Sequence, residues 1–450
     1  MGYWQSEREF TAFCREYLQK EGFVSIGEAG EIGGNKPAGT IPAGTKIFKH
    51  VKEKTLVFAV TGSKPLSEGF NMVAAHVDSP RIDCKTNPLY EKNHLALFDT
   101  RYYGGIKPYQ WTAMPLSMHG VVFTKDGGRK NICIGEEDAD PIFTITDLLP
   151  HLAREQMKKT AAEFIGGEEL DILAGSKPYK TPEQEENNIE ESNIEEKVKL
   201  NILNILFEKY GMTEQDFSSA EIEFVPAFPA RDLGLDRSMI GAYGHDDRCC
   251  AFAAFSAAVE LSREGAPEKT IICLLVDKEE TGSYGNTGSQ SRLLENFIAQ
   301  LSGGRTHNAP NQPHDAIGGI FANAQIISAD VNAGFDPNYA DVYDTKTSSY
   351  LGKGITVTKY PGRGGSDAGA EFCHKVQSLF DKNNVRWQHG DMGKVGAGGG
   401  GTIAWCFSNL GAEVIDCGIP VLSMHSPFEV ISKIDLWTCY KAYRTFLNAI

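Results

Sequence analysis

The stretch TIICLLVDKEETGS, residues 270–283, runs from a continuous apolar segment into an acidic pair, Glu279 and Glu280. A short apolar run that ends in this way predicts a strand. Because the side chains of neighbouring residues point apart, one glutamate can bind a metal ion while the other handles a proton. The stretch therefore predicts a strand and, directly after it, part of a hydrolytic site.

Histidine and acidic residues also stand where other apolar runs end. In NMVAAHVDSPR, residues 71–81, strand alternation puts His76 and Asp78 on one face, where the carboxylate can hold the ring of a ligating imidazole. Asp330 follows the run AQIISA in the same way. Because open α/β sheets carry their chemistry at the carboxyl ends of strands, we expect these groups to share one site.

Two further candidates have plain structural explanations when each is taken alone. Asp246 and Asp247 precede an apolar, Ala-rich stretch from Cys249 to Leu261, where they can cap a helix. His425, in LSMHSPFE, can bond its own backbone. The conjunction of all these groups nevertheless favours a single site for two metal ions.

The charge of such a site supports this interpretation. Three carboxylates and two neutral imidazoles around two divalent cations leave about one positive charge, which a bridging hydroxide can cancel. Carboxylate and imidazole ligands without thiolate suit zinc, cobalt or manganese. We therefore expect two divalent metal ions, zinc first and cobalt or manganese as the alternatives.

The α/β pattern of the chain is interrupted once. From residue 249 onward helical and strand patterns alternate as in βα units, which implies a mixed, mostly parallel sheet flanked by helices. A segment rich in aromatic residues, Gly and Pro separates this part from the first strands and reads as short strands and turns. We predict a catalytic domain at residues 1–91 and 237–450 and an inserted β-rich domain at 92–236. The apolar spacing also predicts an amphipathic helix near the N-terminus and a helix over residues 145–159.

Composition excludes several kinds of partner. The 450 residues include 44 Lys and Arg against 59 Asp and Glu, a net charge of −15, and no basic stretch with interleaved aromatic residues. Nucleic acid and anionic membranes are therefore not expected as partners. The 10 cysteines are scattered without a CxxC pair, and no export signal or long apolar span stands out, so a cytoplasmic protein is expected.

The segments AAHVDSPR, YGHDDR, DKEETGS, SADVNAGFDPNY and SMHSPFE resemble the motif series of the aspartyl aminopeptidase and aminopeptidase I family of dinuclear zinc exopeptidases in order, spacing and flanking residues. The resemblance runs from residue 70 to the C-terminus. It implies the following roles: Asp246 bridges the metals, His76 and Asp330 complete one site, Glu280 and His425 complete the other, Glu279 is the general base and Asp78 orients His76.

The resemblance also concerns the inserted domain. His151 resembles a family histidine that reaches the active site of a neighbouring subunit, and it could equally lie on an amphipathic helix without catalytic contact. The family assembles into tetrahedral dodecamers through this domain, which implies a large closed homo-oligomer here.

Together these observations predict a cytoplasmic metallo-aminopeptidase that acts on peptides with a free N-terminus. One alternative is an N-acyl amino acid deacylase or carboxypeptidase with the same dinuclear site. The other is a catalytically silent assembly protein, which the complete acid cluster disfavours because such a cluster repels itself without metal. An acidic substrate side chain would need a cation such as Lys359, Arg363 or Lys394. Eukaryotic members of the family that this chain resembles carry a more basic segment where this chain has PGRGGSDAGAEF, and this difference favours substrates with a neutral first side chain.

Overall fold

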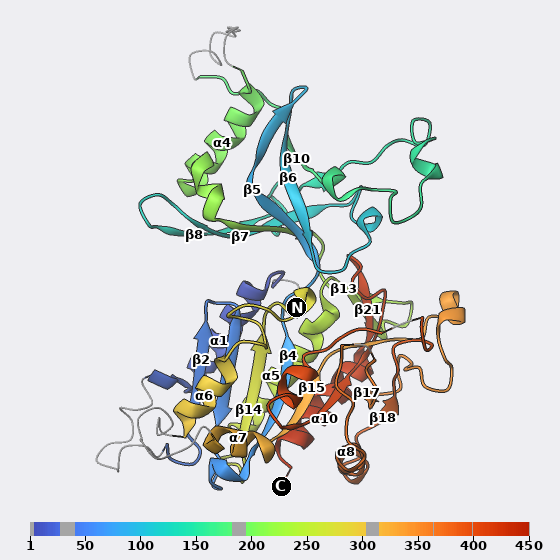
Figure 1. Cartoon of the computed structure of the whole chain (residues 1–450). Helices are drawn as coiled ribbons and strands as arrows, with labels where there is room; N and C mark the ends of the chain where they lie inside the picture. The colour runs from blue at the N-terminus through green and yellow to red at the C-terminus, as the bar shows by residue number, and fades with distance from the viewer. Residues whose placement is uncertain are drawn as a thin grey trace. The chain divides into compact units, whose positions relative to one another are not determined.

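The computed structural model describes residues 4–27, 41–181, 195–302, 315–362, 364–397 and 399–449. The chain divides into two compact units (Figure 1). Unit 1 comprises Pro80–Pro229 with residues 4–5 and His425–Pro427, and unit 2 comprises Ser6–Ser79, Ala230–Met424 and Phe428–Ile450. Unit 1 begins before the predicted boundary at residue 92 because β5 (Arg81–Lys92) pairs along most of its length with β6 (Leu95–Tyr103).

Unit 2 is built on a mixed sheet. Within the described ranges the sheet has nine strands in the order β1-β2-β3-β14-β4-β15-β19-β17-β18. The central strands β14, β4, β15 and β19 are parallel, whereas β3 and β17 pair with them in the antiparallel direction. The bounds are β1 (Val24–Ser25), β2 (Lys46–Val51), β3 (Thr55–Val60), β4 (Phe70–His76), β14 (Thr270–Val276), β15 (Gln325–Ala329), β17 (Ile355–Thr358), β18 (Trp387–His389) and β19 (Glu413–Gly418). The predicted mixed, mostly parallel sheet is confirmed.

Helices cover the sheet of unit 2 on both faces, which explains why β4 and β14 are buried at every residue. Phe70, Phe297 and Phe321 belong to the core under α6 and α7. The next residue of β4, Asn71, points the other way and donates to the backbone beyond the end of α10. The helices are α1 (Glu7–Lys20), α5 (His245–Leu261), α6 (Leu293–Leu301), α7 (Asp315–Ala322), α8 (Ala370–Lys382), α9 (Ala404–Ser408) and α10 (Lys433–Leu447). None of the described helices is both long and apolar enough to cross a membrane.

The predicted amphipathic helix near the N-terminus is confirmed as α1. Ser6 and Glu9 form a capping box at its start, which satisfies backbone N–H groups that the helix itself leaves without acceptors. Phe10, Cys14 and Leu18 are buried along one side of the helix. This spacing is the apolar face that the sequence predicts.

A smaller sheet of unit 2 leads into α5. In the described part of the chain it contains β12 (Arg231–Leu233), β13 (Met239–Ala242), β21 (Glu429–Ser432), β20 (Pro420–Leu422) and β16 (Asn332–Ala333), in that order. The antiparallel register of β13 and β21 sets Ala242 opposite Glu429. The short link from β13 to α5 therefore leaves the sheet beside Glu429.

Unit 1 is an antiparallel sheet with a separate core. Its described strands run in the order β8-β7-β11-β5-β6-β10-β9. The remaining bounds are β7 (Leu116–Phe123), β8 (Arg129–Ile134), β9 (Thr144–Ile145), β10 (Ile172–Gly175) and β11 (Glu221–Pro226), with helix α4 (Lys197–Tyr210). The rings of Phe98, Phe143 and Phe224 pack against one another in its core. This unit is the β-rich region expected from the aromatic, Gly- and Pro-rich segment.

The predicted helix over residues 145–159 is wrong. The segment is mostly turns, with one short 3-10 helix, η3 (Gln156–Lys158). Pro150 has no N–H to donate and disfavours helical geometry at the residue before it. Leu148, Leu149 and Leu152 are half or more exposed, so no core holds an apolar helix face here.

Candidate metal centre

Three neighbouring strands of the nine-stranded sheet end at one edge and carry candidate residues. β4 ends at His76, and its parallel neighbour β14 ends opposite it at Val276. On the other side of β4, β15 ends one residue before Asp330. The 3-10 turn η6 (Glu279–Thr281) follows β14 and carries both glutamates. The strand order thus brings these side chains to the same edge of the sheet.

His76 lies between two carboxylates and is 1% exposed. Its Nδ1 is 3.0 Å from the backbone oxygen of Asp78 and 3.5 Å from Asp78 Oδ1, and its Nε2 is 3.1 Å from Asp246 Oδ1. Burial lowers the pKa of His76, but hydrogen bonds to Asp246 and Asp78 outweigh burial and raise the pKa well above its ordinary value. A neutral imidazole donates from one nitrogen only. With Nδ1–H held by Asp78, Nε2 offers its lone pair to a cation beside Asp246.

Asp78 also holds the turn that follows β14. Its Oδ1 accepts the backbone N–H of Glu279 at 3.1 Å, and its Oδ2 accepts that of Glu280 at 3.2 Å. Lys278 and Ser283 on either side of the turn have φ of +68° and +63°. Such strained backbone persists where the surrounding structure fixes it, and it clusters at functional sites. Asp78 therefore orients His76 mainly through its backbone oxygen and both glutamates through its carboxylate.

Asp246 enters the site from the start of α5. Asp246 and Asp247 have non-helical backbone angles, so the first turn of the helix is irregular where these acidic residues stand. The backbone N–H of Asp246 donates to Glu429 Oε2 at 3.0 Å, and its backbone oxygen accepts from Ser79 Oγ at 2.7 Å. The sequence analysis gave no role to Glu429 or Ser79, because their contacts to Asp246 join segments that are far apart in the chain.

The side chains fit the proposed metals. The ligand atoms of His76, Asp246 and Glu280 lie within 4.8 Å of one another, and so do those of His76, Asp247 and Asp330. Imidazole and carboxylate oxygen are ligands that zinc accepts in catalytic sites. Asp247, which was not predicted as a ligand, thus joins four of the five predicted ones.

The carboxylates of this cluster repel one another. Burial, followed by the nearby charges of Asp246 and Glu279, raises the pKa of Asp330 well above its ordinary value, although His76 opposes the shift. Burial also raises the pKa of Asp247 well above its ordinary value. A divalent cation favours the charged form of carboxylates that bind it. The cluster is therefore chemically suited to cations.

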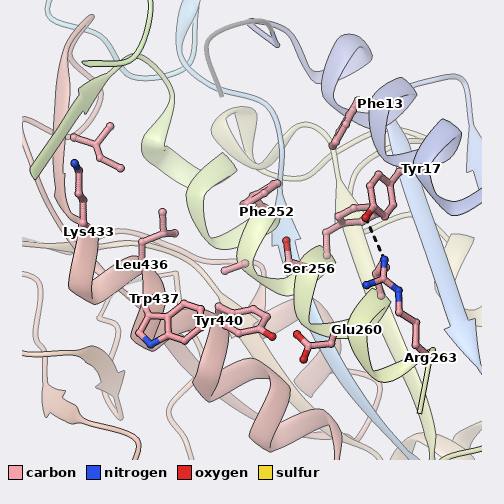
Figure 2. A pocket seen from close by; sticks show the side chains of 14 residues that line it. Phe13, Tyr17, Phe252, Ser256, Glu260, Arg263, Lys433, Leu436, Trp437 and Tyr440 are labelled. Atoms are coloured by element: carbon pink, nitrogen blue, oxygen red, sulfur yellow. Dashed lines mark hydrogen bonds between the residues drawn. The ribbon is translucent and has the colours of Figure 1, made fainter. Parts of the chain in front are cut away.

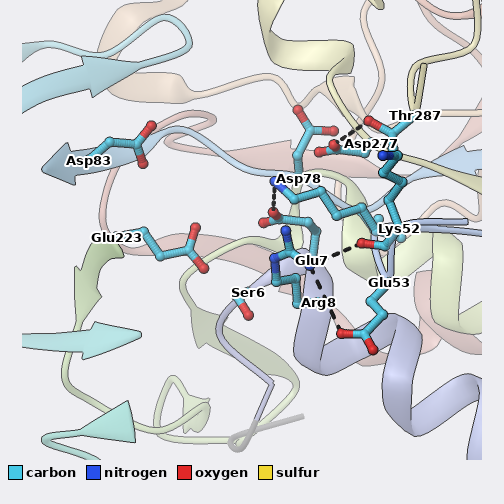
Figure 3. Close-up of polar contacts among 12 residues, drawn as sticks. Ser6, Glu7, Arg8, Lys52, Glu53, Asp78, Asp83, Glu223, Asp277 and Thr287 are labelled. Atoms are coloured by element: carbon cyan, nitrogen blue, oxygen red, sulfur yellow. Dashed lines mark hydrogen bonds and ion pairs between the residues drawn. The ribbon is translucent and has the colours of Figure 1, made fainter. Parts of the chain in front are cut away.

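A buried polar network supports Asp78 from the side of α1. Glu7 and Lys54, both buried, form an ion pair of 3.0 Å, and Thr287 Oγ1 donates to Asp277 Oδ2 at 2.8 Å. Figure 3 shows Glu7 and Asp277 near Asp78, with Thr287 hydrogen-bonded to Asp277. Burial, then the charges of Glu7 and Asp78, raise the pKa of Asp277 to about 7, and Lys54 opposes that shift. None of Glu7, Lys54 and Asp277 was predicted from the sequence as part of the site.

Each of the remaining predicted residues has its own surroundings. His425 belongs to unit 1, where its Nδ1 is 2.8 Å from the backbone oxygen of Gly105, and its role as a ligand stays a prediction. His151 is exposed in the turns of unit 1. Lys394 is exposed and donates to the backbone oxygen of Asp341.

Lys359 and Arg363 are the other two cations that could bind an acidic substrate side chain. Lys359 lies over the ring of Tyr360 at 5.0 Å. Arg363 lies outside the described residues.

An apolar concavity of unit 2 is lined by none of the metal-cluster residues. A pocket of about 620 Å³ between α1, α5 and α10 is lined by rings that include Phe13, Phe252 and Trp437 (Figure 2). The cations at its rim are paired, Arg263 with Glu21 and Lys433 with Asp232. Its lining offers one carboxylate, that of Glu260, and no imidazole, so it lacks a ligand set for metal ions.

The chain resembles known proteins over almost its whole length. The profile of the family described as aminopeptidase I zinc metalloprotease (M18) matches residues 3–447. A relative from Clostridium acetobutylicum, a probable M18 family aminopeptidase 1, is 43% identical over 448 residues, covering 99% of this chain and 92% of the relative. The crystal structure of an M18 aminopeptidase from Thermotoga maritima superposes with a TM-score of 0.88 at 40% identity, covering 99% and 93% of the two chains. The S. cerevisiae mApe1 dodecamer shares the fold, with a TM-score of 0.75 at 21% identity and coverage of 98% and 93%.

Proposed function

Because the chain belongs to the aminopeptidase I family of zinc metalloproteases and is a zinc-dependent aminopeptidase, we propose that the acid cluster at the strand ends holds its zinc ions and that Glu279 is its general base. The enzyme is a hydrolase that acts on peptide bonds. The deacylase and carboxypeptidase alternative is not favoured, because the relatives are named as aminopeptidases.

The proposed ligands divide between two ions. In this assignment His76 and Asp330 would hold one zinc ion, Glu280 and His425 would hold the other, and Asp246 would be a ligand of both. Bound zinc lowers the pKa of a coordinated water towards 7 and polarises the scissile carbonyl.

The remaining steps are carried by side chains of this chain. Glu279 takes a proton from the attacking water and passes it to the leaving amine. Glu280, its neighbour in the same turn, would be a metal ligand instead, because its ligand atom lies within 4.8 Å of those of His76 and Asp246. The observation that carries this assignment is the double hydrogen bond of Asp78 to the two backbone N–H groups, because it fixes which way each glutamate leaves the turn.

The substrate is proposed to be a peptide with a free N-terminus and a neutral first side chain. A small cavity beside Asp330 is lined by Asn332, Thr358, Met392 and Asp416, and the described residues around it include no cation. Burial raises the pKa of Asp416 to about 6, so this buried wall becomes negative near neutral pH. This cavity, of about 10 Å³, is too small to hold a substrate side chain, but its negative wall would repel an acidic side chain bound nearby and would not repel a neutral one.

We further propose that the chain forms a tetrahedral dodecamer through unit 1. Several large apolar side chains of this unit are 50–69% exposed: Ile142, Leu148, Leu149, Leu152 and Met157. Exposed apolar residues gathered in one segment are typical of protein interfaces. The fold relative named above is a dodecamer. His151 lies within this segment and is proposed to reach a neighbouring subunit's active site.

The proposed compartment is the cytoplasm. All 10 cysteines of the chain are free thiols. Free thiols persist in a reducing environment, whereas exported proteins tend to pair them.

The proposed function is tested with paired peptides and with metal exchange. Chelation should abolish hydrolysis of a free peptide, and zinc, cobalt or manganese should restore it. The N-acetylated form of the same peptide should not be cleaved. Full activity after exhaustive chelation, or faster cleavage of the blocked peptide, would contradict the proposal.

A further inference from the structure

The backbone of Asp246 is held from both sides. Its N–H donates to Glu429 Oε2 at 3.0 Å, and its carbonyl oxygen accepts from Ser79 Oγ at 2.7 Å. Glu429 and Ser79 are each 1% exposed, and Asp246 is 4% exposed. Both hydrogen bonds therefore lie in an environment where water does not compete for them, and each constrains the peptide unit that carries the proposed bridging carboxylate.

The N–H of Asp246 needs such an acceptor. Asp246 stands in the first turn of α5, where backbone N–H groups have no partner within the helix. A buried N–H without an acceptor costs free energy comparable to a lost hydrogen bond. Because the backbone angles of Asp246 are not helical, a neighbouring element has to supply the acceptor, and Glu429 does so.

The pairing of β13 with β21 places Glu429 beside the start of α5. The register sets Glu429 opposite Ala242, four residues before Asp246. The two strands are tightly packed beside this pair, since a Cβ atom on Gly241 would lie 2.2 Å from the ring of Phe428. The strand pair thus fixes the carboxylate of Glu429 relative to the start of α5.

We propose that Glu429 is a positioning residue for the metal centre, which acts by fixing the peptide of Asp246 and hence the place of its carboxylate between the two metals. The inference rests on the proposed role of Asp246 as the bridging ligand. Hydrogen-bond partners that orient metal ligands typically change metal affinity or activity by about 10–100-fold when they are removed. Glu429 acts on the backbone of a ligand rather than on its side chain.

The test compares two substitutions at Glu429 in the full chain. Glu429→Ala removes the acceptor and should weaken zinc binding about 10–100-fold, measured by competition with a chromophoric chelator. Glu429→Gln keeps an oxygen that can accept the same N–H and should stay within about threefold of the parent protein, since a neutral acceptor is only moderately weaker than a charged one. The visible spectrum of the cobalt-loaded protein should change in the Ala variant and be preserved in the Gln variant.

A matched control separates positioning from stability. Asp435 is also a buried carboxylate that accepts backbone N–H groups in unit 2, those of Gly352 and Gly354 at 2.6 and 2.7 Å. Asp435→Asn should leave zinc affinity and the cobalt spectrum unchanged even where it lowers the melting temperature. If Glu429→Ala does not fold, Ser79→Ala removes the opposite hydrogen bond and should shift zinc affinity and spectrum in the same direction.

The outcomes distinguish this inference from the proposed function. A parent protein that binds no zinc at the cluster would overturn the proposed function itself. A parent that binds zinc, together with Ala variants of Glu429 and Ser79 that bind it equally well with unchanged cobalt spectra, would overturn only the positioning role. A Gln variant as weak as the Ala variant would also overturn it, because the hydrogen bond would then not be the cause.

Discussion

The strand ends of unit 2 and the turn-rich segment of unit 1 depart from ordinary solvation in opposite ways. In unit 2, Asp78, Asp246 and Asp247 are carboxylates that are at most 4% exposed, whereas in unit 1 Leu152 and Met157 are apolar side chains that are each 69% exposed. A buried acid cluster needs a cation, and an exposed apolar segment needs a protein surface. Each departure therefore indicates the kind of partner that the region takes.

The largest expected effect concerns the chemistry of the buried cluster. Glu279→Gln keeps the shape of the side chain but removes the proton acceptor, so kcat should fall by about 10²–10⁴-fold while the zinc content stays that of the parent protein. Steady-state kinetics and metal analysis of the same sample measure both quantities. Unchanged turnover would remove Glu279 from the role of general base.

The exposed segment of unit 1 is tested by charge. Leu152→Glu combined with Met157→Glu should shift the protein from a large assembly towards the monomer at micromolar concentration, because a charge in an apolar interface has to lose its water. Light scattering after size-exclusion chromatography measures the mass.

Lys159→Glu in the same segment is the control, since it adds a negative charge without removing an apolar contact, and it should preserve the assembly. A parent protein that is already monomeric would contradict the interface, and so would a double variant with the parent's mass.

The network beneath Asp78 should be sensitive to loss of its cation. Lys54→Met leaves Glu7 and Asp277 buried without their positive neighbour, so the free energy of unfolding should fall by about 3–5 kcal/mol. Adding Glu7→Gln should recover part of that loss. Denaturant unfolding measures both changes.

The matched control is Lys64→Met, which breaks an exposed pair with Glu268 and should change the free energy of unfolding much less, because water screens an exposed pair. Equal effects of the two lysine substitutions would show that the buried pair of Lys54 and Glu7 contributes no more to the free energy of unfolding than the exposed pair.

The smallest expected effect is a pH dependence at Asp277. Its pKa is raised to about 7 in the folded chain, so between its ordinary pKa and pH 7 the folded state binds the extra proton and stability falls as pH rises. Asp277→Asn removes this titration. The melting temperature of the variant relative to the parent should therefore be higher at pH 8 than at pH 5, and an identical difference at both pH values would contradict the shifted pKa.

The sequence predicts the sheet of unit 2 well, because its strands are continuous apolar runs, and the conjunction of His and acidic residues at the ends of those runs indicates one site. Residues such as His76 and Asp330 could therefore be placed at strand ends before the fold was known. Glu429 could not be found in this way, since its contact to Asp246 depends on the register of β13 and β21. The ion pair of Glu7 and Lys54 could not be predicted for the same reason, because its two residues come from distant segments of the chain.

The segment over residues 145–159 teaches the opposite lesson. Its apolar spacing suits a helix, but helices in proteins depend mainly on a core that receives their apolar face. Leu149 and Leu152 have no such core within unit 1, and Pro150 removes a donor, so the segment forms turns. The spacing of apolar residues alone does not distinguish a face that packs within a subunit from one that packs against another subunit.

The most direct test of the central claim is the number of metal ions bound by the protein and by variants of its ligands. Dialysis against zinc followed by elemental analysis should give two ions per chain in the parent protein. Asp246→Ala should lose both ions, because the bridging carboxylate serves both sites, whereas Glu280→Ala should retain one. A parent protein with no bound zinc, or an Asp246→Ala variant that keeps two ions, would contradict the assignment of the buried cluster as a dinuclear metal centre.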